Sequence, residues 1–467
     1  MQASDSSIKK ILSRCIDILT SKGHYADASY KYEKDMSVSK DKTSLDAEDG
    51  FDEGVRLRIF DGERFRDYCQ SGIEEKSLLK HANFLLKTAQ RNIPRKKLEL
   101  KIDTKKLKKS FKSLGKIDPT KITIKDKIAI CEKTHNNFMK SKDFVNVRVM
   151  YRESITKSVF VNEYKQLSQR LTRVTFVVMP FVKSTKGEIR YHYKAFYKPG
   201  FEATNITRSD IAKVKEMALK VRKAKKIKPG QYDCFLTPEV SGLLAHESFG
   251  HGMESDTILM GRAKAEEYLG KRIASDDVSI IENPAYPNAH GTLFFDDEGQ
   301  VATETYLIKN GIVTHPITDQ YSISKFDKDN KYHLTANGRA ENYDHKIYAR
   351  MTNTYFDKGK DNPKKMLASI KNGMYLHYSS GGMEDPKGWG VQIQGIVAER
   401  IKNGKLTGEV FYEVGMTGFL PNILKNISHV GKDLSVPGSG FCGKGHKEWV
   451  KVAEGGPSLA IKGVHLS

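Results

Sequence analysis

Hydrophobic positions in the first 228 residues repeat with two different periods. Some segments carry apolar residues every three or four positions, which predicts amphipathic helices, and others alternate apolar with polar residues, which predicts strands. The helical period covers residues 7–22, 77–91, 122–140 and 205–223. The alternating period covers residues 25–32, 54–60, 145–152, 158–164, 173–182 and 191–197. Because polar turns separate the alternating segments, we expect an antiparallel sheet.

The pattern changes after the turn signal Lys228-Pro229-Gly230. Short alternating segments separated by turn residues dominate the remainder, and only 238–251 and 363–372 have a convincing helical pattern. The sequence therefore predicts the α+β class with two domains. We expect an N-terminal α/β domain (1–228) with an antiparallel sheet, packed on a β-rich C-terminal domain (229–467) that carries the first of these two helices.

Charged residues are placed unevenly along the 467 residues of the chain. Lys and Arg number 78 and Asp and Glu 57, which gives a net charge of +21. About half of this excess lies in residues 91–127, which contain 14 basic and 4 acidic residues. This segment has few aromatic residues that could stack on bases, so we interpret it as a lysine-rich insert or linker. Nucleic acid is expected to make at most a weak electrostatic contact with it.

Cysteine content and hydropathy indicate the compartment. The 5 cysteines are scattered and include no CxxC pair. This argues against a disulfide framework, so a functional cysteine is expected to be a metal ligand or a nucleophile. A membrane-spanning helix needs about 20 consecutive apolar residues, and the sequence has no such run. The start of the chain has no secretory signal pattern. We therefore expect a cytoplasmic protein without a membrane partner.

The predicted helix 238–251 contains the segment His246-Glu247-Ser248-Phe249-Gly250-His251. Two imidazoles and a carboxylate this close together are typical of a zinc site whose glutamate activates a bound water. A regular helix turns about 100° per residue, so it would point residues five apart about 140° away from each other. Both rings can reach one ion only through a π-turn or an unwound turn, and we predict such a distortion over residues 248–250. The alternative is two unrelated histidines on a core helix.

A third zinc ligand is available late in the chain. A catalytic zinc site takes three protein ligands and keeps one position open. Cys442 lies in the glycine-rich segment 438–445, where backbone can approach another element closely. The neighbouring Lys444 and a bound cation would lower the pKa of its thiol. A buried structural thiol is the other interpretation, and it suits the cysteines in apolar periodic segments better.

Several further blocks occur in collinear order and cover nearly the whole chain. They are residues 25–28, 54–58, 243–256, 295–299, 337–339, 349–355, 380–382, 403–405 and 442–445. Together these blocks resemble the TldD/PmbA metalloprotease family, whose members are also called modulators of DNA gyrase. The resemblance implies a zinc-dependent peptidase with one zinc ion per chain. It implies His246, His251 and Cys442 as the metal ligands and Glu247 as the general base.

The resemblance also implies how the protein assembles and what it cleaves. In this family TldD-type subunits carry the motif and TldE/PmbA-type subunits lack it, so this chain resembles the catalytic type. The implied assembly is a dimer that encloses the active sites, either a homodimer or a heterodimer with a TldE/PmbA-type subunit. The expected substrate is a peptide or an unfolded protein segment, hydrolysed by metal-activated water with Glu247 as the base.

Further residues are candidates for contact with substrate or for support of the metal ligands: Lys444, Glu254, Asp256, Arg339 and Arg350. The basic ones could bind a substrate carboxylate or pair with the acidic block 296–298. His446 stands where family members usually have Gln, and it would add an imidazole near the metal loop. A second hypothesis is a non-enzymatic, nucleic-acid-associated or regulatory partner subunit. The position of the basic segment, remote from the motif, favours the peptidase.

Overall fold

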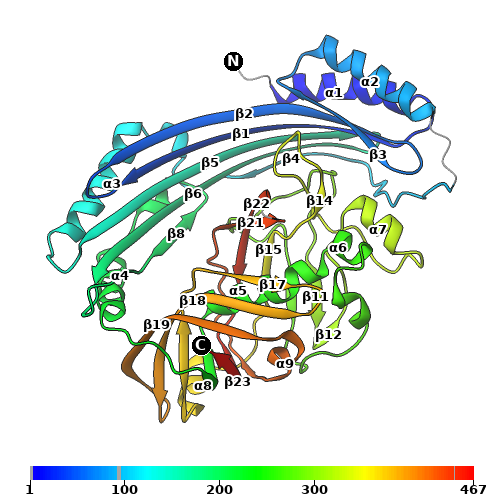
Figure 1. Ribbon diagram of the computed structural model, residues 1–467. Helices are drawn as coiled ribbons and strands as arrows, with labels where there is room; N and C mark the ends of the chain where they lie inside the picture. Colours follow the sequence, from blue (N-terminus) through cyan, green and yellow to red (C-terminus); the bar gives the residue numbers. More distant parts are fainter. Residues whose placement is uncertain (1–3, 92–95, 446) are drawn as a thin grey trace.

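The computed structural model describes residues 4–91, 96–445 and 447–467 and has two parts (Figure 1). Within the described residues, the first part holds an eight-stranded sheet and four α-helices. Its elements are α1 (Asp5–Thr20), β1 (Ala26–Lys40), β2 (Leu45–Phe60), β3 (Phe65–Ser71), α2 (Glu75–Gln90), β4 (Leu107–Ser113), α3 (Ile124–Met139), β5 (Asn146–Asn162), β6 (Lys165–Lys183), β7 (Ile189–Tyr191), β8 (Lys194–Lys198) and α4 (Arg208–Arg222).

The sheet of the first part arches over the rest of the molecule (Figure 1). Its strand order is β3-β2-β1-β5-β6-β4, with β7 and β8 paired to β6. The long strands β1, β2, β5 and β6 pair antiparallel, as the alternating pattern predicts. The apolar faces of α1 and α2 form one core with β1 and β2, and those of α3 and α4 form another with β5 and β6. All four helices lie where the helical period predicts them.

Strand β5 differs from its prediction. The pattern predicts two strands, 145–152 and 158–164, but the structure has one continuous strand. Three polar residues between them, Glu153, Ser154 and Thr156, are buried, and Glu153 forms an ion pair with Lys127 at 2.7 Å. A short polar stretch between two apolar segments predicts a turn. The apolar and polar pattern cannot show that such residues are buried and paired with residues far away in sequence.

The lysine-rich segment contributes a strand that its sequence does not predict. Strand β4 runs parallel to β6 from Leu107 to Ser113, so these residues belong to the sheet and not to a linker. Leu107 and Phe111 face a small apolar cluster, whereas the neighbouring lysines are exposed.

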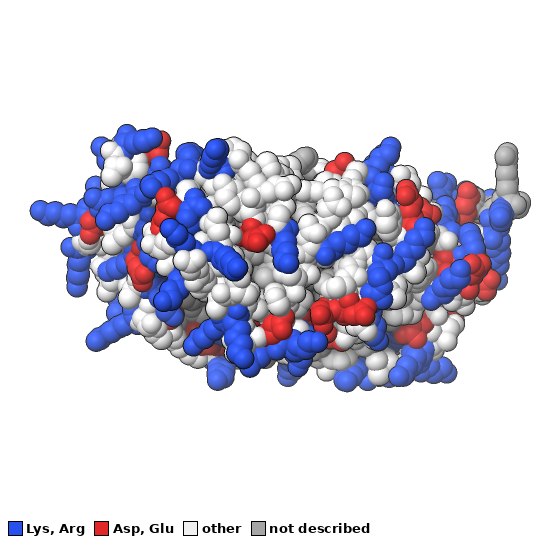
Figure 2. Space-filling view, turned by 90° about the horizontal axis from the view of Figure 1, so that it is seen from below, with Lys and Arg blue, Asp and Glu red and all other residues white. Residues whose placement is uncertain are grey.

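Figure 2 shows Lys and Arg side chains spread over one face of the molecule among Asp and Glu side chains. On that face the positive charge is therefore distributed and not gathered in one patch.

The second part consists of sheets and short helices. Its elements are β9 (Gly230–Leu236), α5 (Pro238–Ala245), α6 (Ser255–Leu259), β10 (Ile280–Glu282), β11 (Thr305–Lys309), β12 (Ile312–Val313), α7 (Gln320–Phe326), β13 (Gly338–Arg339), β14 (Tyr348–Ala349), β15 (Asn353–Phe356), α8 (Pro363–Ser369), β16 (Asn372–His377), β17 (Gly381–Asp385), β18 (Gly390–Lys402), β19 (Lys405–Phe419), α9 (Leu420–Lys425), β20 (Ile427–Val430), β21 (Gly440–Lys444), β22 (Lys447–Gly455) and β23 (Leu459–Leu466). In the part of the chain that the structure describes, no helix is long and apolar enough to span a membrane.

Two larger sheets enclose helix α5. One has the order β16-β9-β23-β19-β18-β17, with β20 paired to β23, and the other has the order β12-β11-β10-β15-β22-β21. Val240 and Leu244 of α5 are buried in the core that both sheets share. The helix predicted over 363–372 is present as α8, whereas α6, α7 and α9 were not predicted. These three helices have only 5 to 7 residues, too few to establish a helical period.

A buried ion cluster connects the two parts. Arg58 of β2 pairs with Asp27 of β1 at 2.7 Å and with Glu298 of the second part at 2.9 Å. The three side chains are at most 5% exposed. Buried charges are tolerated only when they are paired, so this cluster depends on all three members.

Replacing Arg58→Ala should lower the free energy of unfolding by about 3–5 kcal/mol, because it leaves two carboxylates buried without their cation. Urea denaturation followed by circular dichroism measures the change. The control is Lys226→Ala, which removes an exposed ion pair with Glu413 and should cost at most about 1 kcal/mol. Equal effects of the two substitutions would contradict the role assigned to the cluster.

Candidate metal centre

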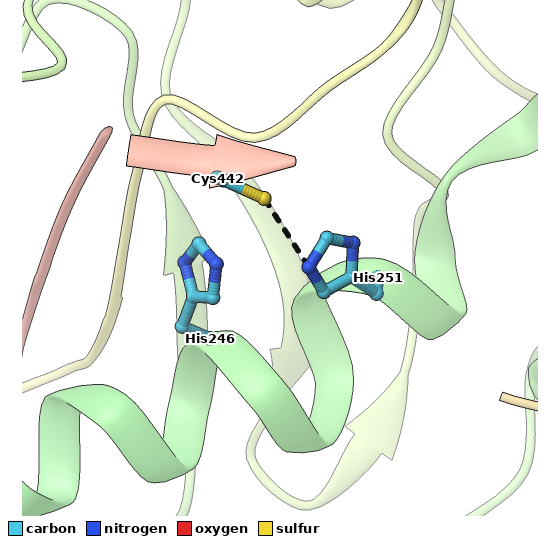
Figure 3. A group of neighbouring side chains, drawn as sticks. All are labelled: His246, His251 and Cys442. Carbon is cyan, nitrogen blue, oxygen red and sulfur yellow. Dashed lines mark hydrogen bonds between the residues drawn. The ribbon is translucent and has the colours of Figure 1, made fainter. Parts of the chain in front are cut away.

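The His-Glu-His segment begins where α5 ends. The α-helix runs to Ala245, residues His246–Gly250 form a π-helical turn, and residues His251–Met253 form a 3-10 turn. A π-turn brings residues five apart onto the same side of a helix. The predicted distortion is therefore confirmed, and both imidazoles point toward the same strand in Figure 3.

Two glycines allow the π-turn to pack tightly. At Gly250 a Cβ atom would lie 1.8 Å from Sδ of Met351, so a side chain there would displace the core. At Gly382 in β17 a Cβ atom would lie 2.6 Å from Cγ of Glu247. The first glycine lets the turn approach the chain next to β15, and the second leaves room for the Glu247 side chain.

Cys442 of β21 meets the two imidazoles. Its Sγ atom lies 3.2 Å from Nε2 of His251, and one donor atom from each of His246, His251 and Cys442 lies within 4.8 Å of the others. Zinc binds nitrogen at about 2.0 Å and sulfur at about 2.3 Å. The three donor atoms are therefore close enough together for one zinc ion to bind between them.

The donor atoms have the properties of metal ligands. His246 is buried, and the Nδ1 side of its ring, which has no hydrogen-bond partner in the described residues, faces away from Cys442 and His251, so its other ring nitrogen faces them (Figure 3). Burial would raise the pKa of the Cys442 thiol, but the two histidines outweigh this and hold it well below its usual value. This lowered pKa favours the thiolate of Cys442, the form that binds metals. The three residues fit a zinc ion.

A network of charged groups orients these ligands. Glu254 lies 3.5 Å from Nδ1 of His251, and its carboxylate also approaches Arg350 at 3.5 Å and Lys444 at 3.0 Å. Arg350 donates to Sγ of Cys442 at 3.2 Å and to its carbonyl oxygen at 2.7 Å. Lys444 also pairs with Asp256 at 2.7 Å. A carboxylate behind a metal-binding histidine fixes the ring orientation and tunes the ligand.

Replacing Glu254→Gln should weaken zinc binding by about 10- to 100-fold, because the amide cannot pair with the cations and orients His251 less well. Competition with a chelating dye measures the affinity. Glu267→Gln changes an exposed carboxylate and should leave the affinity unchanged. An unchanged affinity for Glu254→Gln would show that this carboxylate does not support the ligand.

The candidate ligands line a cavity of about 1340 Å³. Glu247, which is partly exposed, lines the same cavity. Arg64, Phe65 and Asp67 of the first part contribute to its wall, so the arching sheet helps to enclose the site. A carboxylate at the wall of a cavity, one residue from a candidate metal ligand, can reach a molecule bound there.

The remaining predicted residues divide into two groups. Glu254, Asp256, Arg350 and Lys444 surround the candidate ligands, as described above, and the two basic residues pair there and not with the acidic block 296–298. Arg339 lies elsewhere: it donates to the carbonyl oxygens of residues 351 and 451, the latter at 2.8 Å. It does not line the metal cavity in the part of the chain that the structure describes. His446 lies outside the described residues.

Glu384 of β17 also lines the cavity, and the sequence analysis missed it. Both of its carboxylate oxygens are buried without a hydrogen-bond partner in the described residues. A signal was present, because Gly382 and Glu384 are alternate residues of a strand and therefore face the same side. That signal has meaning only once Gly382 is known to contact Glu247.

A mixed α/β fold in which two histidines and a thiolate converge beside a carboxylate is typical of a metallohydrolase. Residues 229–467 match the family model of the PmbA/TldA metallopeptidase C-terminal domain, just over half of the chain. The chain belongs to the TldD/PmbA family of metallopeptidases, as its sequence blocks indicate. This is a family of proteases, so the predicted enzyme class is confirmed at that level.

Relatives and solved structures agree with this assignment. The chain is 29% identical to a metalloprotease of Methanocaldococcus jannaschii, over 94% of this chain and 96% of the relative. It is 31% identical to a metalloprotease of Methanothermobacter thermautotrophicus, over 68% and 69% of the two chains, and 32% identical to a zinc metalloprotease TldD homolog of Saccharolobus solfataricus, over 50% and 51%.

Two solved structures share the fold. A putative modulator of DNA gyrase from Bacteroides thetaiotaomicron has a TM-score of 0.77 at 18% identity, with all of both chains covered. TldE from Thermococcus kodakarensis has a TM-score of 0.73 at 12% identity, covering 98% of this chain and all of TldE. The predicted fold class is thereby confirmed.

Proposed function

We propose that this protein is a zinc-dependent peptidase that hydrolyses peptides or unfolded protein segments, with Glu247 as the general base. The observation that carries the proposal is the convergence of His246, His251 and Cys442 beside Glu247 on the wall of one cavity. The metalloprotease names of the relatives support it.

His246, His251 and Cys442 would hold the ion. When bound, zinc supplies a Lewis acid that polarises the scissile carbonyl and increases the acidity of water. Glu247 accepts the proton of the attacking water at a carboxylate oxygen and passes it to the nitrogen of the leaving amine. Arg350 and Lys444 balance the charge of Cys442 and Glu254, and neither pairs with Glu247 in the described residues, which suits Glu247 to act as a base.

The cavity favours extended substrates. Strand β17 is the last strand of its sheet in the described residues, and it lines the cavity next to Glu247. A peptide could add to its free edge through main-chain hydrogen bonds. An unfolded segment can adopt this conformation, whereas a folded protein would first have to expose a strand.

A dimer is part of the same proposal. Membership in the TldD/PmbA family supports either two copies of this chain or a pair with a TldE/PmbA-type subunit. Light scattering of the purified chain, alone and mixed with such a subunit from the same organism, distinguishes the two assemblies.

The test of the proposed function is metal-dependent cleavage of an unstructured peptide. The purified chain should lose at least about 90% of its activity after treatment with a chelator, since its ligands hold the only catalytic ion that the proposal requires. Adding about one equivalent of zinc should restore the activity. Mass spectrometry of the peptide products measures cleavage in each preparation. Cleavage that persists in the metal-free protein would contradict the proposal.

A further inference from the structure

Exposed apolar side chains gather around the metal cavity. In the part of the chain that the structure describes, the second part exposes seven large apolar side chains, and five of them line this cavity: Leu259, Met260, Met383, Phe441 and Trp449. The other two are Leu406 and Phe419. Single exposed apolar residues are common on protein surfaces, but a group of them around one cavity is typical of a binding site.

Several charged groups of the cavity wall are already paired within the protein. Lys444 lies 3.0 Å from Glu254 and 2.7 Å from Asp256, and Arg58 pairs with Glu298 at 2.9 Å. A substrate gains little from charges that are compensated in this way, whereas contact with an exposed apolar side chain removes apolar surface from water. The five apolar side chains therefore offer a substrate more binding energy than the paired charges do.

Met383 of β17 lies next to the glycine that contacts the proposed base. A Cβ atom on Gly382 would lie 2.6 Å from Cγ of Glu247. Successive residues of a strand face opposite sides of the sheet, so Met383 faces away from Glu247, and it is 56% exposed. A peptide that adds to the edge of β17 therefore places the residue opposite Gly382 beside Glu247. The residues on either side of it lie on the face of Met383.

Two aromatic rings lie on the opposite wall, on the hairpin of β21 and β22. Phe441 directly precedes Cys442, and a Cβ atom on Gly443 would lie 3.0 Å from Cζ3 of Trp449. Both rings also line a neighbouring cavity of about 410 Å³ between the two parts of the molecule. They therefore lie where the two cavities meet, and an extended chain that leaves the metal centre in this direction passes them.

The remaining two apolar residues extend the wall beyond the metal ligands. Leu259 ends helix α6, which begins directly after Glu254, and Met260 follows it. A methionine side chain is flexible and polarisable, so it can pack against apolar side chains of different shapes. Met260 and Met383 therefore suit a preference for a class of side chains and not for one residue type.

We propose that the enzyme selects unfolded segments in which large apolar side chains flank the scissile bond, and that Met383 is a main determinant of this preference. The inference rests on the proposed peptidase function and names its substrate class. Large apolar side chains are mostly buried in folded proteins and become accessible when a chain unfolds. The apolar wall would therefore direct hydrolysis to segments that come from the cores of other proteins.

The test compares two soluble peptides of equal length and charge, one with Leu and the other with Ser at every second position. The zinc-loaded enzyme should have a kcat/KM about 10- to 100-fold higher for the Leu peptide. Met383→Ser should reduce this preference about 10-fold, because it removes apolar surface beside the scissile bond. Leu406→Ser is the matched control and should keep the preference. Leu406 is exposed on β19 and does not line the metal cavity in the described residues.

A binding measurement makes the test independent of turnover. In the Glu247→Gln background, calorimetry should show that the Leu peptide binds at least about 10-fold more tightly than the Ser peptide. Met383→Ser in the same background should remove most of this difference, and Leu406→Ser should keep it.

Equal kcat/KM values for the two peptides would overturn the preference, while metal-dependent hydrolysis would still support the peptidase. An unchanged preference in Met383→Ser would overturn the role of Met383, and loss of the dimer in that variant, measured by light scattering, would assign the residue to a contact between chains. If neither peptide is hydrolysed, the proposed function fails, and the calorimetric comparison alone decides whether the cavity prefers apolar segments.

Discussion

Glu247→Gln should reduce kcat/KM for an unstructured peptide by about 10²- to 10⁴-fold, the range for loss of a general base. The amide has nearly the same shape as the carboxylate, so it should fit against Gly382 as before. It cannot accept the proton of the attacking water. Glu247 is also not one of the three candidate metal ligands, so the variant should retain its zinc. Peptide kinetics together with elemental analysis measure both quantities.

A carboxylate on α5, the helix that precedes the π-turn, provides the control for this prediction. Glu239 of α5 forms a partly exposed ion pair with Lys194 at 3.4 Å, and Glu239→Gln should leave activity close to that of the unmodified protein. Substantial turnover by Glu247→Gln, in a preparation free of other proteases, would remove Glu247 as the base. Loss of zinc from this variant would instead indicate that the side chain helps to hold the ion.

Removing any one of the three candidate ligands should release the metal. His246→Ala, His251→Ala and Cys442→Ser each leave two protein ligands, too few to hold zinc against a chelator. The zinc content should fall from about one ion per chain to nearly none, and peptide hydrolysis should be lost with it. Elemental analysis after dialysis against a chelator measures the content.

Matched controls separate metal loss from general damage. Cys69→Ser changes a partly exposed cysteine whose thiol contacts a backbone carbonyl, and His429→Ala changes an exposed histidine. Both variants should keep about one zinc per chain. Retention of zinc by His251→Ala in particular would mean that the two histidines do not share an ion, even though the π-turn brings them together.

Local periodicity was sufficient for much of the fold. Helices α1, α2, α3 and α4 carry apolar residues at helical spacing over four or more turns, and each is present. The five-residue spacing of His246 and His251 likewise implied a π-turn or an unwound turn if both bind one ion, because the geometry of a single helix relates these residues. Features of this kind depend only on residues close together in sequence.

Pairing between distant segments depended on the tertiary structure. Strand β4 is recognisable only through its parallel pairing with β6, whose paired residues lie 58 positions later in the chain. The break predicted within β5 is bridged because Glu153 finds Lys127 on α3. In both cases the partner lies outside any window over which alternation can be judged.

The metal centre shows the same division. The sequence by itself indicated the donor residues, and the resemblance to a family joined Cys442 to the two histidines. Only the folded chain brings Cys442 to His251 across 191 residues and turns Arg350 toward the Cys442 sulfur. Folding also buries the Glu384 carboxylate, which has no hydrogen-bond partner among the described residues. Burial and pairing of charges depend on which distant groups the packing brings together, so tertiary structure alone decides them.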